Sequence, residues 1–436
     1  MEVLALLLFI SILVLILYGY PVAFTLGGIS ILYALCFLDP VSFTALPPRI
    51  MGVMSNSILI AVPLFIFMGI MLEKSGLAES LLETMAMLFG SVPGGLAISV
   101  VIVGALLAAS TGIVGATVVT MGLISLPTML KRGYRPELAT GTIAASGTLG
   151  QIIPPSVVLV LLGSVLNVPV GDLFKAALLP GVLLVASYIA YIAIRAFRDP
   201  SIAPSIPKEE VKKFLNQSNV VWKIFIAFLL PLLLIVAVLG SIFTGIATPT
   251  EAAGIGALGA ILLTFGQRKF SLDVLRTVMQ ETTHLTCMVF VILLGATTFS
   301  FVFREMGGDI YLVQLIERSD LSPTMFLILV MLVIFVAGFF IDFIEIIFII
   351  VPVVAPIFDQ QYGMNLTWIG ILIALNLQTS FLSPPFGFSL FYLKGVAPPE
   401  VTTQHLYRGI VPFVLIQLVF LFAVIFFPQL VLGFLD

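Results

Sequence analysis

The chain of 436 residues is 60% hydrophobic and 9% charged, and its mean hydropathy is +1.23. These values exclude a soluble globular protein and predict an all-α polytopic membrane protein surrounded by the lipid bilayer. The formal net charge of −3 carries no information about partners, and no basic tract in the sequence points to nucleic acid.

Apolar runs long enough to form membrane helices follow one another along the chain. The first begins at Val3 without a basic segment or a small-residue cleavage site, so we expect a retained helix rather than a signal peptide. Cys36 and Cys287 stand alone within such runs and imply neither a disulfide framework nor a metal site. The expected membrane helices are residues 3–18, 21–38, 56–73, 136–165 (broken), 172–197, 221–240, 249–266, 280–303, 365–393 (broken) and 406–430.

Two further apolar blocks, residues 94–130 and 323–358, are each interrupted near the middle. The interruptions are Ala109-Ser110-Thr111-Gly112 and Gly338-Phe339-Phe340-Ile341-Asp342. Each arm of such a block has ~15–18 residues and reaches only about 22–27 Å at 1.5 Å per residue. We therefore predict two re-entrant helical hairpins, and two full membrane spans in each block are the alternative.

A pair of prolines stands in the middle of each of two uncharged stretches. Pro154-Pro155 lies within residues 138–171 and Pro384-Pro385 within residues 360–393, and each stretch has 34 residues without Asp, Glu, Lys or Arg. Adjacent prolines cannot continue a helix, and backbone groups freed inside a membrane must face protein or a water-filled cavity. Two broken helices at matching positions of two halves point to the binding site of a transporter.

Landmarks of the first half recur in the second half after 229–232 residues. Gly76 matches Gly307, Pro154-Pro155 matches Pro384-Pro385, and Pro180 matches Pro412. Five predicted crossings separate equivalent points, and an odd number of crossings inverts the second copy. The sequence therefore predicts inverted structural repeats, which many carriers use to build two alternately open states.

Lysine and arginine are distributed unequally between the two faces of this layout. Only Arg49, Lys175, Arg304 and Arg318 fall on the side of the N-terminus, and the other Lys and Arg residues fall on the opposite side. The positive-inside rule makes that opposite side cytoplasmic, so both termini are predicted to be periplasmic. The expected segments are 1–55 (N-terminal scaffold helices), 56–198 (first repeat), 199–220 (cytoplasmic linker), 221–279 (scaffold helices and a connecting arm), 280–430 (second repeat) and 431–436 (tail).

Polar residues gather at the two helix breaks and at the hairpin tips. A helix broken at mid-membrane frees carbonyl oxygens, which suit Na⁺, and N–H groups, which suit an anionic substrate. The pattern predicts two Na⁺ sites flanking one substrate, although Ser, Thr and Gly also serve as ordinary contacts between membrane helices. The expected Na⁺ ligands are Gly112, Ser146, Gly147, Gly150, Gln151, Gly338, Asp342, Asn376, Thr379 and Ser380. The expected substrate contacts are Ser110, Thr111, Pro154, Ser156, Ser383 and Pro384.

Asp342 and Glu345 lie one helical turn apart inside the second block. A carboxylate within a membrane is costly and usually functional, so we expect Asp342 to hold an ion or to latch the hairpin tip. A helix cap is the alternative for Asp342, and a proton relay is a further one for Glu345. The run Thr248-Pro249-Thr250-Glu251 predicts a helix start with a capping box.

Four segments together resemble the large membrane subunit (M, or DctM-type) of tripartite ATP-independent periplasmic (TRAP) transporters. They are Gly133-Tyr134, Gly147-Thr148-Leu149-Gly150-Gln151-Ile152-Ile153-Pro154-Pro155-Ser156, Gly245-Ile246-Ala247-Thr248-Pro249-Thr250-Glu251-Ala252-Ala253 and Ser383-Pro384-Pro385-Phe386-Gly387.

The resemblance implies Na⁺-driven uptake of an organic acid across a bacterial inner membrane by an elevator motion, with a fold of the ion transporter superfamily. It implies two partners, a small four-helix Q-type membrane subunit and a periplasmic binding protein (P-type). Phe386 departs from the commoner family pattern and resembles a branch associated with 2-oxo acids and lactate.

The sequence therefore predicts a secondary active permease for a carboxylate, with Na⁺ as coupling ion and no other cofactor. No ATP-binding motif, Ser/His/Asp set, metal cluster or phosphate loop occurs in the sequence, so we do not expect an enzyme. One alternative is a stand-alone Na⁺/carboxylate symporter of the same superfamily. The other is an intramembrane enzyme that uses Asp342 and Glu345.

Overall fold

The computed structural model describes residues 2–111, 114–216, 219–319, 321–433 and 435, and every regular element within them is a helix. Within these ranges, eight helical stretches are long and apolar enough to cross a membrane. The prediction of an all-α polytopic membrane protein is confirmed.

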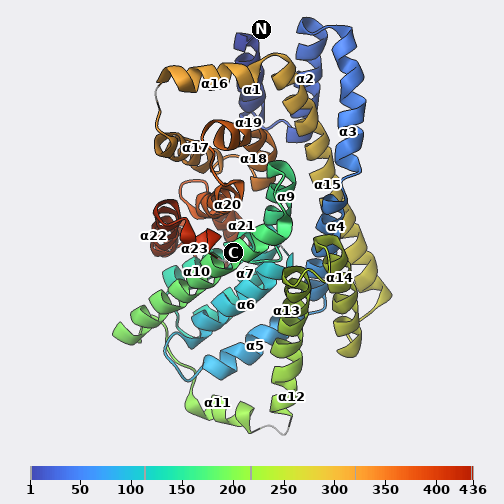
Figure 1. Cartoon of the computed structure of the whole chain (residues 1–436). Helices are drawn as coiled ribbons and strands as arrows, with labels where there is room; N and C mark the ends of the chain where they lie inside the picture. The colour runs from blue at the N-terminus through green and yellow to red at the C-terminus, as the bar shows by residue number, and fades with distance from the viewer. Residues whose placement is uncertain (1, 112–113, 217–218, 320, 434, 436) are drawn as a thin grey trace.

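One group of helices is built around the longest helix of the chain, α15, which has 34 residues. At 1.5 Å per residue it extends about 51 Å, well beyond a hydrocarbon core of about 30 Å. It packs against α2 and α4, and α4 packs against α14 (Figure 1). The group comprises α1 (Glu2–Leu17), α2 (Val22–Phe37), α3 (Leu46–Met54), α4 (Ala61–Lys74), α12 (Val220–Ile224), α13 (Leu230–Phe243), α14 (Pro249–Gly266) and α15 (Leu272–Glu305).

The remaining membrane helices form two series with the same order of elements. The first series is α5 (Leu77–Phe89), α6 (Gly95–Thr111), α7 (Val114–Lys131), α8 (Pro136–Thr148), α9 (Val157–Leu166) and α10 (Val170–Arg198). The second is α16 (Gly308–Ser319), α17 (Pro323–Ala337), α18 (Phe343–Ile349), α19 (Val351–Pro356), α20 (Leu366–Leu382), α21 (Phe388–Val396) and α22 (Thr403–Phe426). The short α11 (Lys208–Leu215) and α23 (Gln429–Leu432) follow the first and second series respectively.

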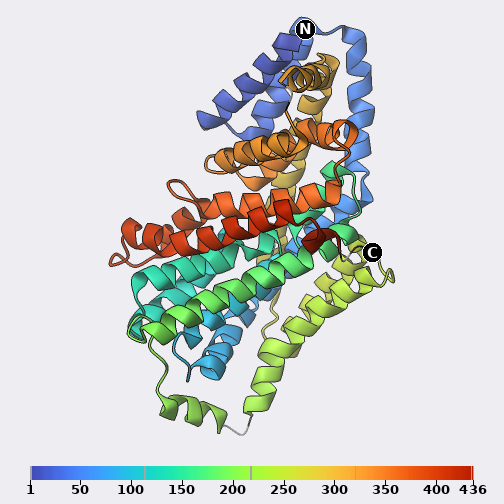
Figure 2. The ribbon, with the colours of Figure 1, turned by 60° about the vertical axis from the view of Figure 1, so that its left-hand side comes forward.

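The two series are packed into each other. Figure 2 shows the orange-red helices α20 and α22 lying alongside the teal and green helices of the first series. α22 contacts α8 and α10, while α20 contacts α8, α9 and α10. A Cβ atom built at Gly141 of α8 would lie 2.6 Å from the carbonyl carbon of Gly409 of α22, so small residues let these two backbones meet.

α3, α5 and α16 are three of the helices absent from the sequence-based prediction. α5 and α16 each begin directly after a glycine in the left-handed region, Gly76 (φ 66°) and Gly307 (φ 76°), where a side chain would be strained. α3 follows a short 3₁₀ turn. Figure 1 shows α16 lying across the end of α1. Each of the three is short, so a search for spans of membrane length passes over them.

Other boundaries differ in a similar way. The predicted helix 280–303 is the C-terminal part of α15, which begins at Leu272, so the expected connecting arm is partly helical. The polar segment 199–220 contains α11, and Arg132 and Glu210 form an ion pair of 3.1 Å that ties α11 to the end of α7. The capping box at the start of α14 is confirmed, since Thr248 N donates to Glu251 Oε2 at 2.8 Å and Glu251 N to Thr248 Oγ1 at 3.3 Å.

Candidate functional site

The first break separates α8 from α9. α8 ends at Thr148 and passes through a short 3₁₀ turn (Leu149–Gln151), and α9 begins only at Val157. The Pro154–Pro155 peptide bond between them is cis. Ser156 precedes α9 but its hydroxyl donates to the Gln151 carbonyl at 3.1 Å, and no side chain caps the helix. The N–H groups of the first turn of α9 are therefore open to an anionic group.

Polar side chains around the first break are fully buried. Ser146 Oγ donates to the Ile143 carbonyl at 3.0 Å and Thr148 Oγ1 to the Ala145 carbonyl at 2.9 Å. Both hydroxyl oxygens keep lone pairs for a cation. Gln151 has no accessible surface, and neither atom of its amide has a hydrogen-bond partner among the described residues. A buried amide without partners is costly, so Gln151 is a strong candidate for a ligand-binding residue.

The second break repeats this arrangement between α20 and α21. α20 ends at Leu382, the Pro384–Pro385 bond is cis, and α21 begins at Phe388 without a side-chain cap. Ser383 Oγ donates to the Thr379 carbonyl at 2.8 Å. The first N–H groups of α21 are thus open in the same way as those of α9.

Polar groups of the second break lie on the buried α20. Thr379 Oγ1 donates to the Leu375 carbonyl at 2.7 Å and Ser380 Oγ to the Leu377 carbonyl at 2.8 Å. Asn376 Nδ2 donates to the Met331 carbonyl of α17 at 2.6 Å, while its Oδ1 lacks a partner among the described residues. Both amide atoms of the buried Gln378 lack one too. Gln378 is not among the ligands expected from the sequence, and its missing partners single it out.

In each series, a glycine of the predicted hairpin packs against a serine of the broken helix. A Cβ atom at Gly104 of α6 would lie 2.6 Å from Ser146 Oγ, and one at Gly338, which ends α17, would overlap Ser380. The second pair stands 234 positions after the first, about one helical turn from the positions that the 229–232 repeat relates. These contacts hold the predicted hairpins directly against the hydroxyl groups at the two breaks.

Two glycines near the first break serve the same close approach. A Cβ atom at Gly150 would lie 2.8 Å from the carbonyl carbon of Ala108 in α6, and one at Gly147 would lie 3.2 Å from the Cα of Val118 in α7. Both arms of the first hairpin therefore touch the break. The predicted tip residue Gly112 lies outside the described residues, as do the side chains of Ser110 and Thr111, so their expected roles stay predictions.

Asp342 is the N-cap of α18. Its Oδ1 accepts from Phe343 N at 2.6 Å, and its backbone N–H donates to Glu345 Oε2 at 3.2 Å. This capping box is the structural role that the sequence left as the alternative. The Asp342 side chain also accepts from the backbone N–H of Glu345. A carboxylate that accepts two backbone hydrogen bonds keeps further lone pairs, so an ion-binding role is compatible with the cap.

The fold brings the two breaks together although they are far apart in the sequence. α9 packs against α20, and α21 packs against α8. α18 and α19 contact α9, and α7 contacts α21. Each hairpin therefore touches the second half of the other broken helix. The result is one buried region in which carbonyl, hydroxyl and amide oxygens lie close to two uncapped helix N-termini.

Comparison with known proteins agrees with this architecture. The family model for the DctM component of the tripartite ATP-independent periplasmic transporter matches residues 9–430. The chain is 31% identical over 410 residues to a C4-dicarboxylate TRAP transporter large permease protein of Pseudomonas aeruginosa, with 93% of this chain and 92% of the relative covered. It is 29% identical over 420 residues to a sialic acid TRAP transporter large permease protein of Vibrio cholerae, with 95% and 94% covered.

One solved structure has a fold similar to that of this chain. The YdaH transporter of Alcanivorax borkumensis, described as having an unusual topology, matches with a TM-score of 0.60. The match covers 88% of this chain and 87% of that chain at 14% identity. At this identity the comparison bears on the fold alone.

Proposed function

Because the chain belongs to the DctM family of TRAP transporter large permease subunits, we propose that it takes up an organic acid across the inner membrane at the expense of a Na⁺ gradient. Members of this family are transporter permeases, and the chain is not an enzyme. A periplasmic binding protein delivers the acid, and a small four-helix membrane subunit completes the assembly. Both termini lie on the periplasmic side.

The observation that carries this proposal is the pair of buried helix breaks. Each break combines an uncapped helix N-terminus with a buried glutamine amide that has no partner in the described chain, Gln151 in one and Gln378 in the other. Carbonyl, hydroxyl and amide oxygens are the ligands that a hard cation such as Na⁺ prefers. Uncapped N–H groups favour a carboxylate. The donor set therefore fits Na⁺ and an acid side by side.

The acid is a carboxylate, and a 2-oxo or 2-hydroxy monocarboxylate is the first to assay. The names of the two relatives above, a C4-dicarboxylate and a sialic acid permease, support the broader class. Ser146, Gly147, Gly150, Asn376, Thr379 and Ser380 supply oxygens or close packing for Na⁺, together with Gly338, Asp342 and Gly112. The acid meets Ser156, Ser383, Pro154, Pro384, Ser110 and Thr111.

The relation between the two series supports an alternating-access motion. In order along the two series, α8, α9 and α10 correspond to α20, α21 and α22. The contacts between the series are reciprocal: α8 contacts α21 and α22, and α20 contacts α9 and α10. Gln417 of α22 donates to the hydroxyl of Tyr188 of α10 at 2.7 Å, so these corresponding helices of the two series meet directly. Corresponding elements of two repeats meet each other near the two-fold axis that relates the repeats. This supports inverted repeats that move together as a transport unit against α2, α4, α14 and α15.

Reconstituted vesicles test the proposal. The chain is incorporated into proteoliposomes with its small partner subunit, and uptake of labelled acid is measured with the binding protein outside. We expect uptake that stops when the binding protein is omitted or when external Na⁺ is replaced by choline. Uptake that persists in choline contradicts Na⁺ coupling. Uptake by the chain alone, without either partner, favours a stand-alone Na⁺/carboxylate symporter.

A further inference from the structure

A cleft away from the breaks separates the helices around α15 from the two series. Its first part is a cavity of about 440 Å³ between α3, α9, α15 and the α18–α19 segment. A second cavity of about 570 Å³ shares Val165, Asn167, Arg304 and Pro352 with the first, so the two are continuous. Asp309 and Asp359 line the second cavity and not the first. These volumes are in the range of small-molecule sites.

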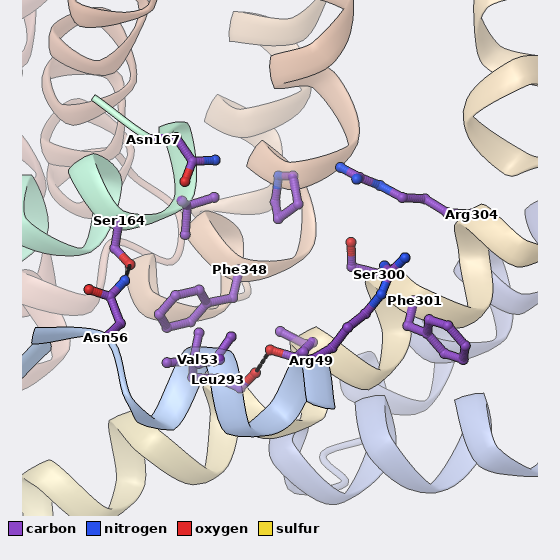
Figure 3. Close-up of a pocket in the computed structure, with 15 residues that line it drawn as sticks. Arg49, Val53, Asn56, Ser164, Asn167, Leu293, Ser300, Phe301, Arg304 and Phe348 are labelled. Carbon is purple, nitrogen blue, oxygen red and sulfur yellow. Dashed lines mark hydrogen bonds between the residues drawn. The ribbon is translucent and has the colours of Figure 1, made fainter. Parts of the chain in front are cut away.

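The first cavity carries two guanidinium groups and no carboxylate among the residues that line it. Figure 3 shows the side chains of Arg49 and Arg304 both reaching into the cavity. Arg49 lies over the ring of Phe301, 4.9 Å from its centroid, which engages the face of the guanidinium and leaves its N–H edge free. Neither guanidinium group forms an ion pair or a hydrogen bond with another described residue.

The rest of the lining suits a small acid. Hydrogen-bonding groups come from Ser300, Thr297 and the amide of Asn56, which donates to Ser164 Oγ at 3.2 Å (Figure 3). Apolar surface comes from Val53, Leu293 and Phe348. Two guanidinium groups in partly apolar surroundings favour a carboxylate, which each can bind through two parallel N–H···O bonds.

The cavity is also connected to the first break through α9. Asn167 marks one end of α9, and Ser156 of the first break marks the other. α9 has 10 residues and is therefore about 15 Å long. Under the proposed topology, Arg49 and Arg304 belong to the small set of basic residues on the periplasmic side.

We propose that Arg49 and Arg304 form an outer carboxylate-binding site, which holds the acid after delivery and before it reaches the helix breaks. The direction of travel rests on the proposed function, whereas the ligand chemistry rests on the cavity alone. The competing occupant is an acidic side chain of the docked binding protein. The cavity volume and the position of the cavity between helices favour the small acid.

The electrostatic part of the proposal is tested by thiol labelling. Cys36 and Cys287 are replaced by serine, Ser300→Cys is introduced, and right-side-out vesicles are treated with an anionic or a cationic methanethiosulfonate. We expect the anionic reagent to react faster, and Arg49→Gln or Arg304→Gln to lower the ratio of the two rates by about three- to tenfold. Arg318→Gln, an exposed change on the same predicted face, leaves the ratio unchanged. Equal rates in all variants overturn the site, as does labelling only from the inside.

Ligand identity is tested in the same vesicles. Pyruvate and succinate, a monocarboxylate and a dicarboxylate, are added during labelling, with glycerol as a neutral control. We expect at least one acid to slow labelling about threefold or more when both arginines are present and to have no effect when either is glutamine. Protection by acid-free binding protein but by neither acid overturns the proposal in favour of a protein carboxylate. Because labelling needs no gradient, a transporter that fails Na⁺-driven uptake yet shows this protection refutes the proposed function alone.

Discussion

A methyl group added at Gly338 tests whether the second hairpin closes against α20. Gly338 has φ −66° and ψ −6°, which alanine adopts freely, so backbone strain does not contribute. The new Cβ atom would lie 2.7 Å from Ser380 Cβ and overlap its hydroxyl. Carbon atoms prefer about 3.5–4.0 Å, and α20 is buried at this point, so the hairpin must move away. Overpacking of this kind costs about 1–3 kcal/mol, which shifts the closed hairpin toward an open one by about 5- to 150-fold.

The assay is thermal unfolding in detergent together with Na⁺-driven uptake. We expect Gly338→Ala to lower both, while Gly254→Ala in α14, where a Cβ atom meets nothing within 4 Å, lowers neither. The double variant Gly338→Ala/Ser380→Gly removes the overlapping group. Its stability should exceed the additive expectation by about 1 kcal/mol or more. Strict additivity, or equal behaviour of the two alanine variants, refutes the packing inferred at the tip.

Leucine in place of Gln151 or Gln378 removes an amide that has no partner in the described chain. The free energy of unfolding should therefore stay the same or rise by about 1–3 kcal/mol, while uptake falls at least about tenfold. Intact uptake would exclude these amides from the site. By contrast, Gln417→Leu leaves the buried Tyr188 hydroxyl unpaired and should lower the unfolding free energy by about 1–3 kcal/mol, as denaturant titration would show. Asp342→Asn preserves a good N-cap, so the free energy of unfolding should stay the same. The Na⁺ concentration for half-maximal uptake should rise about tenfold. Normal uptake at limiting Na⁺ would exclude Asp342 from the ion site.

Hydropathy and proline placement were enough to predict the membrane helices and the positions of both breaks. α8 and α20 end before their proline pairs because adjacent prolines lack N–H donors and clash with a preceding helical turn. α5 and α16 were missed from the sequence because short helices with charged residues do not resemble membrane spans. Their starting glycines were visible as a repeated landmark, but a left-handed φ angle is a property of the backbone and not of composition.

The candidate site was only partly predictable for a related reason. The sequence showed which polar residues flank the breaks, but all of them could have formed ordinary helix contacts. Packing separates them: the hydroxyls of Ser146 and Ser380 meet a glycine of the facing helix, and the amides of Gln151 and Gln378 meet no partner in the described chain. The Arg49 and Arg304 cavity depends on helices distant in sequence, so no local pattern could predict it.

The central claim is that two inverted helix breaks bind Na⁺ and the acid. A cryo-electron microscopy map of the assembled transporter, collected in Na⁺ with the acid bound, tests it most directly. We expect the α6–α7 and α17–α18 hairpins to enter from opposite faces, with ion density next to the oxygens of both breaks and acid density between them. Hairpins that enter from one face, or an acid bound far from both proline pairs, would contradict the claim.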